Sequence, residues 1–202
     1  GSLLFAMDSD ADYYLVADSD KKIYLIDKNS TGFNSIPLST VEKTRSSAEL
    51  KFYQVEGEQI SDDPDIFNEA WNAGLVGLAA DTLGSAQCAL DQAVNYANQR
   101  EQFNRVIASF QAVKHMCAEM AAQLEPCRAM VWYAAHAFND IPEESTMMAS
   151  HTKAHLSEVA QFVTRTATEV HGGMGFTDLV GLHYWFKRCG FNRQALGSPE
   201  LL

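Results

Sequence analysis

The pattern of hydrophobic and polar positions changes near residue 60. Before it, short apolar runs with β-like texture alternate with turn residues: the runs are 11–17, 22–26 and 48–55, and the breakers are 18–20, 29–32 and 35–37. Strands of roughly 5 to 6 residues between such clusters predict an antiparallel meander. A sheet this small has little to pack against, so we expect residues 1–60 to be part of a larger β-domain.

After residue 60 the apolar positions take the period of a helix. Ser61–Asp65 predicts a helix start, with polar capping residues, an early proline and acidic charge in the first turn. An apolar face then follows at spacings of three to five residues, made of Trp71, Leu75, Leu78, Leu83, Ala86, Leu90 and Val94. One long helix is expected to end near Arg100.

Three further helices are predicted. The second spans about 107–138, kinked at Pro126, and turns inward Phe110, Val113, Cys117, Met120, Leu124 and Trp132. A turn at 139–142 leads to a helix over about 142–170, and a glycine loop at 171–177 to a shorter helix ending near 195. The fold class expected is α+β, mainly α: a partial antiparallel β-domain over 1–60, then an up-down four-helix bundle over 61–202.

Charge narrows the classes of partner. The chain of 202 residues carries a formal net charge of -11, which disfavours binding to nucleic acid or to anionic membranes. No apolar run reaches the roughly 18 residues of a membrane span, and no signal-peptide pattern is visible. The four cysteines form no CxxC pair, as in a reducing compartment. We therefore expect a cytoplasmic protein with no membrane span. No helical histidine belongs to an E-x-x-H pair, so no metal site is expected.

Candidate chemistry lies first in the segment 96–111, YANQREQFNRVIASFQ. It combines Arg100 at a helix end, Phe103 three residues on, and Gln111 at the start of the next helix. A guanidinium offers five donors in a rigid fork suited to phosphate oxygens, and a helix corner with free backbone N–H groups favours anions. Taken alone, an arginine such as Arg100 is more often a surface charge.

The second candidate is 171–177, HGGMGFT. Its three glycines permit positive φ and close approach of a flat or phosphorylated ligand. Taken alone, such a segment is more often a helix C-cap and turn than a ligand site. It is not the G-x-G-x-x-G dinucleotide fingerprint, because the spacing differs and no strand precedes it.

Taken in order, these motifs resemble the C-terminal part of the acyl-CoA dehydrogenase family. The matching segments are ALDQAVNYANQR (89–100), REQF, Phe110-Gln111, HGGMGFT and HYWFKR (183–188). FAMDSDADYYLVA (5–17), IYLIDKNSTGF (23–33) and Thr44-Arg45 resemble the later half of the family's middle β-domain. The resemblance spans essentially the whole chain and leaves the family's N-terminal helical domain out. Asn104 departs from it, since the family usually has glycine there.

The resemblance implies an FAD site built from two subunits, and therefore a homo- or hetero-oligomer, a dimer or tetramer. Arg100 would contact the pyrophosphate across the interface, and Phe103 and Gln111 would line the same path. The adenosine side would rest on His171, Gly172, Gly173 and Gly175 of the neighbouring subunit. An acyl-CoA substrate and an electron-transfer flavoprotein or similar acceptor would complete the partners, as in fatty acid metabolism.

The family's reaction needs a carboxylate base, which removes the α-proton while the β-hydride goes to flavin N5. Counting from the glycine loop, the usual position falls on Leu196, before Gly197. Counting back from Arg100, the alternative position falls near Gly74. Neither is acidic, and the catalytic residue is unknown from sequence. Glu69 is a remaining candidate on the first helix. Asp81 is expected to be an exposed acid.

Three functions stay open. The first is an FAD-dependent acyl-CoA dehydrogenase with its base elsewhere, of which this chain is a C-terminal fragment, inactive by itself. The second is a non-catalytic FAD-binding partner subunit of a hetero-oligomeric dehydrogenase. The third is a helical assembly module without flavin.

Overall fold

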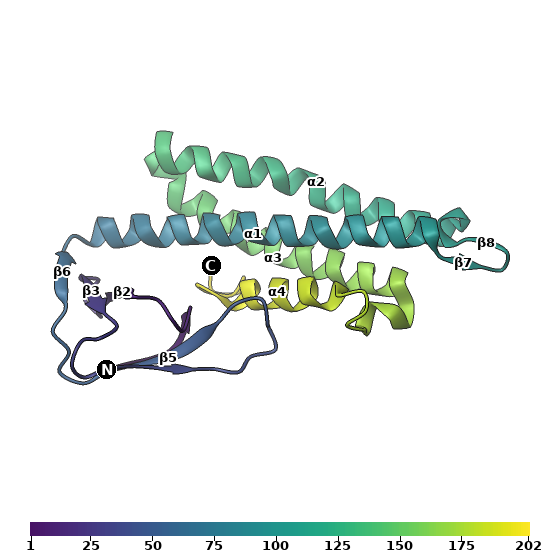
Figure 1. Ribbon diagram of the computed structural model, residues 1–202. Coiled ribbons are helices and arrows are strands. Elements are labelled where there is room, and N and C mark those ends of the chain that lie inside the picture. The colour runs from purple at the N-terminus through teal and green to yellow at the C-terminus, as the bar shows by residue number, and fades with distance from the viewer. The chain divides into compact units, whose positions relative to one another are not determined.

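The computed structural model describes residues 1–202, and the chain divides into two compact units, Gly1–Ala70 and Trp71–Leu202. The first holds the main sheets and the second is helical (Figure 1). The predicted fold class, α+β and mainly α, is confirmed.

The sheet unit contains two antiparallel three-stranded sheets. One has the order β1-β5-β4 and the other β2-β3-β6. The strands are β1 (Ser2–Met7), β2 (Tyr13–Ala17), β3 (Ile23–Asp27), β4 (Phe33–Pro37), β5 (Ser47–Phe52) and β6 (Glu58–Ser61). A small core of Tyr14, Ala48 and Leu50 holds the unit together.

The sequence pattern missed β1, β4 and β6. Residues 35–37 were expected to break the chain, yet they pair with β5, with Ile36 opposite Glu49. The reason is tertiary: the ring of Phe33 lies 5.0 Å from that of Tyr14 and 5.5 Å from that of Phe52, which anchors β4. Pro37 is tolerated because it lies at the end of an edge strand, where a missing N–H costs little.

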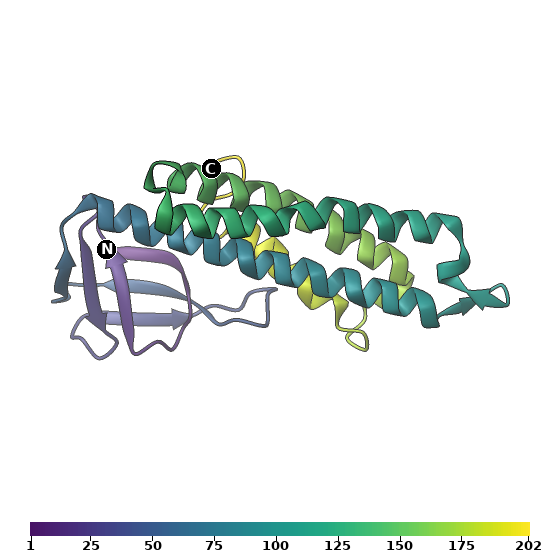
Figure 2. The ribbon, with the colours of Figure 1, turned by 90° about the horizontal axis from the view of Figure 1, so that it is seen from above.

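The helical unit packs four helices around one core. They are α1 (Pro64–Gln99), α2 (Gln111–Asp140), α3 (Pro142–His171) and α4 (Leu182–Gln194). Figures 1 and 2 show α1, α2 and α3 running alongside one another, and their buried alanine, leucine and valine side chains form a continuous cluster with Leu182 and Cys189 of α4. None of these helices is long and apolar enough to cross a membrane.

Local rules place several helix boundaries correctly. The Asp63 carboxylate accepts the backbone N–H of Asp65 at 2.9 Å, and Pro64 is the first residue of α1. Pro126 lies within α2 without ending it. The second helix, however, begins at Gln111 and not near 107, because Ile107–Ser109 forms a 3₁₀ turn and Phe110 is extended.

Some predicted inward positions are wrong. Trp132 is 70% exposed, Trp71 is 38% exposed and Val94 is 37% exposed. All three lie at the margin of an apolar stripe, because a spacing of three to five residues does not fix which positions face the core. Met120 and Leu124 are buried as expected.

A polar network holds α4 against α1. Arg188 donates from Nη2 to Asp81 at 2.7 Å and from Nε at 3.0 Å, and Asn192 donates to the same carboxylate at 2.6 Å. Asn192 also donates to the hydroxyl of Thr82 at 3.0 Å. The expectation that Asp81 is an exposed acid is therefore wrong: the buried face of α1 carries a carboxylate because α4 supplies its donors.

Candidate functional site

A short hairpin carries the first group of candidate residues. After α1, the chain forms β7 (Glu101–Gln102) and β8 (Arg105–Val106), which pair antiparallel. The backbone N–H of Ile107 donates to the carbonyl of Arg100 at 2.8 Å and closes the hairpin. This element extends past the end of α1 (Figures 1 and 2).

The two tip residues explain the departure from the family pattern. Phe103 has φ 55° and Asn104 has φ 62°, so both central residues of the two-residue turn are left-handed. Asparagine tolerates this conformation better than most residues, so it can stand where glycine is usual. Phenylalanine tolerates it poorly, and Phe103 is held there with its ring 86% exposed.

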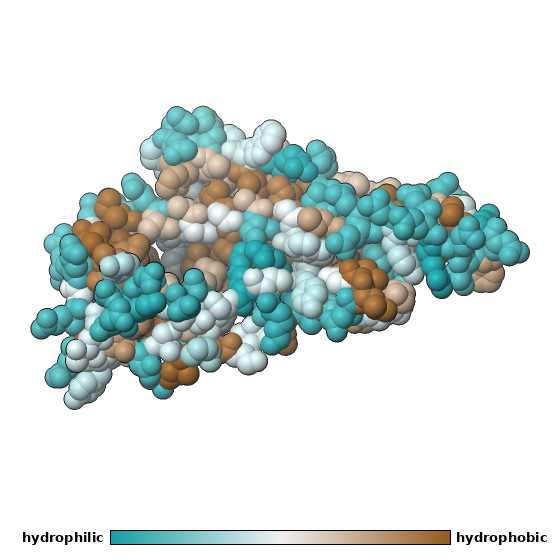
Figure 3. Space-filling model, viewed as in Figure 1, coloured by the Kyte–Doolittle hydropathy of each residue, from teal (hydrophilic) through white to brown (hydrophobic).

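The hairpin end leaves its polar groups available. The guanidinium of Arg100 is exposed and has no partner within the chain, and Gln111, the first residue of α2, is also exposed. The N-terminus of α2 has no side-chain cap, so its first N–H groups lack a protein acceptor. Arg105, in contrast, stacks on the ring of Phe110 with its Cζ 4.0 Å from the centroid. Figure 3 shows mainly hydrophilic surface at this end.

The glycine turn, residues 172–176, forms a 3₁₀ segment after α3. Gly172 has φ 59°, a conformation open to glycine. A Cβ on Gly175 would lie 3.0 Å from the carbonyl oxygen of Thr168, so a side chain at this position would press on the backbone of α3. A Cβ on Gly173 would meet no atom within 4 Å. Gly172 and Gly173 are exposed and Gly175 is buried.

His171 joins the two groups. Its ring is 4% exposed and stacks on that of Tyr96, with centroids 4.4 Å apart. Tyr96 accepts the N–H of Arg100 through its carbonyl at 2.8 Å, so one aromatic pair ties the glycine turn to the hairpin. His171 Nδ1 donates to the carbonyl of Ala167 at 2.8 Å, and burial lowers the pKa of the ring below its ordinary value. The imidazole is therefore neutral near pH 7.

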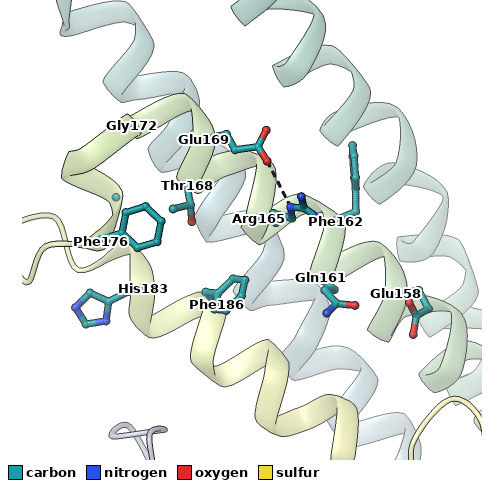
Figure 4. Close-up of a pocket in the computed structure, with 11 residues that line it drawn as sticks. Glu158, Gln161, Phe162, Arg165, Thr168, Glu169, Gly172, Phe176, His183 and Phe186 are labelled. Atoms are coloured by element: carbon teal, nitrogen blue, oxygen red, sulfur yellow. Dashed lines mark ion pairs between the residues drawn. The ribbon is translucent and has the colours of Figure 1, made fainter.

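A groove beside the glycine turn was not foreseen. Its volume is about 730 Å³, and Figure 4 shows Arg165 and Glu169 of α3 paired across 3.4 Å on one side, with Phe176, His183 and Phe186 on the other. His183 Nε2 lies 2.7 Å from Asp178 Oδ1. Figure 3 shows apolar surface in this part of the helical unit. In the sequence, the i, i+3 spacing of His183 and Phe186 could have indicated that these two rings lie on one face of a helix.

The two positions at which a base was sought meet in space. A Cβ on Gly74 of α1 would lie 2.7 Å from Cδ1 of Leu196, which follows α4. Leu196 has φ 53° and is half-buried. Glu69 precedes Gly74 by five residues, so it projects roughly 140° away around the helix axis, and it is exposed. Neither of the two adjoining positions carries an acid.

The residues present suit a dinucleotide. An unpaired guanidinium, uncapped N–H groups of α2 and two exposed glycines supply donors and access for phosphates and a flat ring. No group of three histidine, cysteine or acidic side chains lies close enough to hold a metal ion.

Comparisons with known proteins agree with this geometry. The family model described as "Acyl-CoA dehydrogenase, C-terminal domain" matches residues 65–202. The chain is 31% identical over 204 aligned positions to the acyl-CoA dehydrogenase IpdE2 of Mycobacterium tuberculosis, covering 99% of this chain and 60% of that one.

A second relative is CarC of Acetobacterium woodii, named a subunit of a caffeyl-CoA reductase-Etf complex. It is 36% identical over 118 residues, which is 58% of this chain and 31% of that one. The solved butyryl-CoA dehydrogenase of Megasphaera elsdenii superposes with a TM-score of 0.89 at 26% identity, over 99% of this chain and 56% of that one. The chain thus spans at most about three-fifths of these relatives.

Proposed function

The chain belongs to the acyl-CoA dehydrogenase family, and from that membership we propose that it supplies the C-terminal FAD-binding part of a protein that oxidises acyl-CoA thioesters across the α,β-carbons. The observation that carries the proposal is the Tyr96–His171 stack, since it brings the hairpin of Arg100 and the glycine turn to one end of the helical unit. Both motifs on which the sequence prediction depended therefore serve one surface.

The roles of the chain's own residues follow from their exposure. Arg100 and the N–H groups at the start of α2 would bind the pyrophosphate, and Phe103 and Gln111 would line its path. Gly172 and Gly173 would let the adenosine approach the backbone, while buried His171 and Gly175 shape the turn beneath it. FAD, when bound, supplies the hydride acceptor.

The length of α1 favours a site shared between two chains. Gly74 lies roughly 38 Å along the axis of α1 from Gln99, at 1.5 Å per residue. The hairpin end and the Gly74–Leu196 contact are too far apart to meet the same reacting atoms. We therefore propose an oligomer in which each flavin takes its dinucleotide contacts from one chain and its acyl surroundings from another. CarC is named as part of an Etf complex, which favours an electron-transfer flavoprotein as acceptor here.

The test is the flavin content of the full-length protein with Arg100→Ala. Loss of an unpaired, charged phosphate ligand should weaken FAD binding about 10- to 100-fold while the melting temperature of the flavin-free protein stays unchanged. Arg128→Ala is the matched control, because Arg128 pairs only with groups within the helices, at 3.2 Å from Gln87 and 3.7 Å from Glu125. Unchanged flavin content in the Arg100 variant would exclude Arg100 as a flavin ligand, and absence of flavin from the wild type as well would favour the helical assembly module without flavin.

Activity is tested on the full-length protein by adding a panel of short, long, branched and steroid-like acyl-CoA thioesters. We expect one class to bleach the flavin. The isolated 202-residue chain should not turn over. No bleaching by any member would contradict dehydrogenation by this protein alone.

One observation favours a second candidate, a non-catalytic partner subunit in a hetero-oligomer. The place where the family's base is expected is filled from both sides by Gly74 and Leu196, without a carboxylate. This candidate predicts co-purification with a homologue that carries glutamate at the matching position. An active homo-oligomer would exclude it, and would direct attention to Glu69.

A further inference from the structure

Lys153 is a charged side chain buried in the middle of α3. Lys153 is 2% exposed, and its side chain is the largest among the fully buried residues. Nζ donates to the carbonyl oxygen of Arg193 at 2.8 Å and also to that of Gly197. These two carbonyls bracket the segment 194–196, so one ammonium group ties both ends of the bend that follows α4.

The bend has few other restraints of its own. Ala195 is extended, with φ -63° and ψ 137°, and then Leu196 at φ 53° and Gly197 at φ 102° are both left-handed. Such a backbone cannot continue helical hydrogen bonds, and its carbonyls need other donors. A non-glycine residue at positive φ persists only where its surroundings impose it. Lys153 supplies that restraint from the interior.

A second restraint closes the segment from outside. The guanidinium of Arg193 donates to Glu158 of α3 at 2.8 Å and to Glu200 at 2.5 Å. Hydrogen bonds from Ser198 and then from Arg193 lower the pKa of Glu200 to about 2, so this carboxylate stays charged. The end of α4 and the segment that follows it, residues 193–202, are thus held to α3 at three points: the carbonyls of Arg193 and Gly197 bound by Lys153, and the Glu200 carboxylate bound through Arg193.

A charged lysine is energetically unfavourable at such an interior position. Burial, together with the nearby charge of Arg193, lowers the pKa of Lys153 to about 8. A neutral side chain would fill the same volume without that desolvation, so packing alone does not account for it. The two acceptors account for it, because an ammonium group has three donors on a flexible stem and can reach both.

We infer that Lys153 is a positioning residue, which fixes the side chain at position 196 against Gly74 and thereby shapes the acyl surroundings proposed for that contact. The role in acyl binding rests on the function proposed above, whereas the restraint on 195–202 stands by itself. Lys153 touches neither cofactor nor substrate in this assignment. It acts through the carbonyls of Arg193 and Gly197.

The experiment compares Lys153→Met and Lys153→Gln in the full-length protein. Methionine matches the shape but leaves both carbonyls without a donor, and glutamine keeps two N–H donors without the charge. Leu156→Ala is the control, because Leu156 is buried in the same helix at 1% exposure and belongs to the core cluster, which includes no residue of the segment. The readouts are amide hydrogen exchange of residues 195–202, FAD content, and the flavin absorbance change caused by the thioester to which wild type responds most.

We expect exchange in 195–202 to rise about tenfold or more in the Met variant, less in the Gln variant, and not at all selectively in Leu156→Ala. FAD content should be unchanged, while the apparent Kd of the thioester rises about tenfold. Should the Met variant fail to fold, the Gln variant alone decides between the outcomes. Wild-type exchange in 195–202 of the folded variants would overturn the inference.

The two proposals fail in different ways. A wild-type protein without flavin or thioester response contradicts the proposed function, and exchange still reports on Lys153. Faster exchange with an unchanged thioester Kd overturns the role of Lys153 in acyl binding and leaves only a structural restraint.

Discussion

Two regions of the helical unit differ in whether their polar groups have partners: the hairpin end, and the region around α4. At the hairpin end, Arg100 and Gln111 are exposed and no side chain caps α2. Around α4, Asp81 accepts hydrogen bonds from Arg188 and Asn192, and Lys153 donates to two backbone carbonyls. Both regions are rich in charge, yet only one leaves donors for another molecule.

The difference separates binding from support. Groups without partners cost the isolated fold little while they remain in water, and they gain a partner when a ligand arrives. Groups buried in mutual contact cannot leave without exposing an unsatisfied partner. Substitutions at the two ends should therefore change different measurements: ligand content at the hairpin end, and unfolding free energy around α4.

The largest expected effect is on stability, from Asp81→Ala. Removing the carboxylate takes away the acceptor of the Arg188 hydrogen bonds at a guanidinium that is only 19% exposed, and should lower the unfolding free energy by about 3 kcal/mol. Chemical denaturation measures it. Asp91→Ala, on an exposed turn of the same helix, should change it by less than about 0.5 kcal/mol. Equal effects in the two variants would remove the contrast between the ends.

The glycine turn sharpens the comparison within a few residues. Gly175→Ala pushes a methyl group against the carbonyl oxygen of Thr168 and should lower the unfolding free energy by about 1 to 2 kcal/mol. Gly173→Ala meets open space and should change stability by less than about 0.5 kcal/mol. In the full-length protein, however, we expect Gly173→Ala to lower FAD content. An unaffected flavin content in that variant would place the adenosine elsewhere.

The buried Lys153, which packs against the end of α4, should make the free energy of unfolding depend on pH. Lys153 releases its proton near pH 8 in the folded chain and near 10.5 in the unfolded one, because burial disfavours the charge. Between these values the unfolded chain binds more protons than the folded one. The contribution of Lys153 to the free energy of unfolding therefore rises as the pH increases from 8 to 10.5. Subtracting the unfolding free energy of Lys153→Met from that of wild type at each pH isolates it. A flat difference would mean that the ammonium is not desolvated.

The smallest expected change is at the hairpin tip. Asn104→Gly puts glycine where φ is 62°, and should raise the unfolding free energy by less than about 1 kcal/mol. Thermal melting measures it, with FAD content as the second readout. A clear loss of stability would show that the asparagine side chain has a role beyond tolerating the backbone.

Local signals were enough for much of the fold. The capping residues before Pro64, the long apolar face of α1 and the proline within α2 are all readable from neighbouring positions. Strand β4 and the tip of the hairpin were not. The first depends on packing by Phe33 against a distant strand, and the second places a phenylalanine in a conformation that its residue type does not signal.

The candidate site likewise contains residues that local sequence signals identify and contacts that only the packing of the helices creates. Arg100 and the glycine turn could be singled out because their chemistry is visible in the sequence, but the stacking of Tyr96 on His171 could not. The pairing of Asp81 with Arg188 joins residues 107 positions apart, and an acidic residue on an amphipathic helix gives no sign of its partner. The groove beside α4 likewise depends on how two helices pack. Which residues bind flavin stays a prediction.

The contact between Gly74 and Leu196 also limits the order in which this protein can evolve. A Cβ at position 74 would come within 2.7 Å of the leucine Cδ1, so the leucine side chain must shift to admit even alanine, and a larger residue needs still more room. A carboxylate at position 74 should therefore be accepted more readily once residue 196 is shorter. The two sites are therefore epistatic, and paired libraries should recover combinations that single-site scanning rejects.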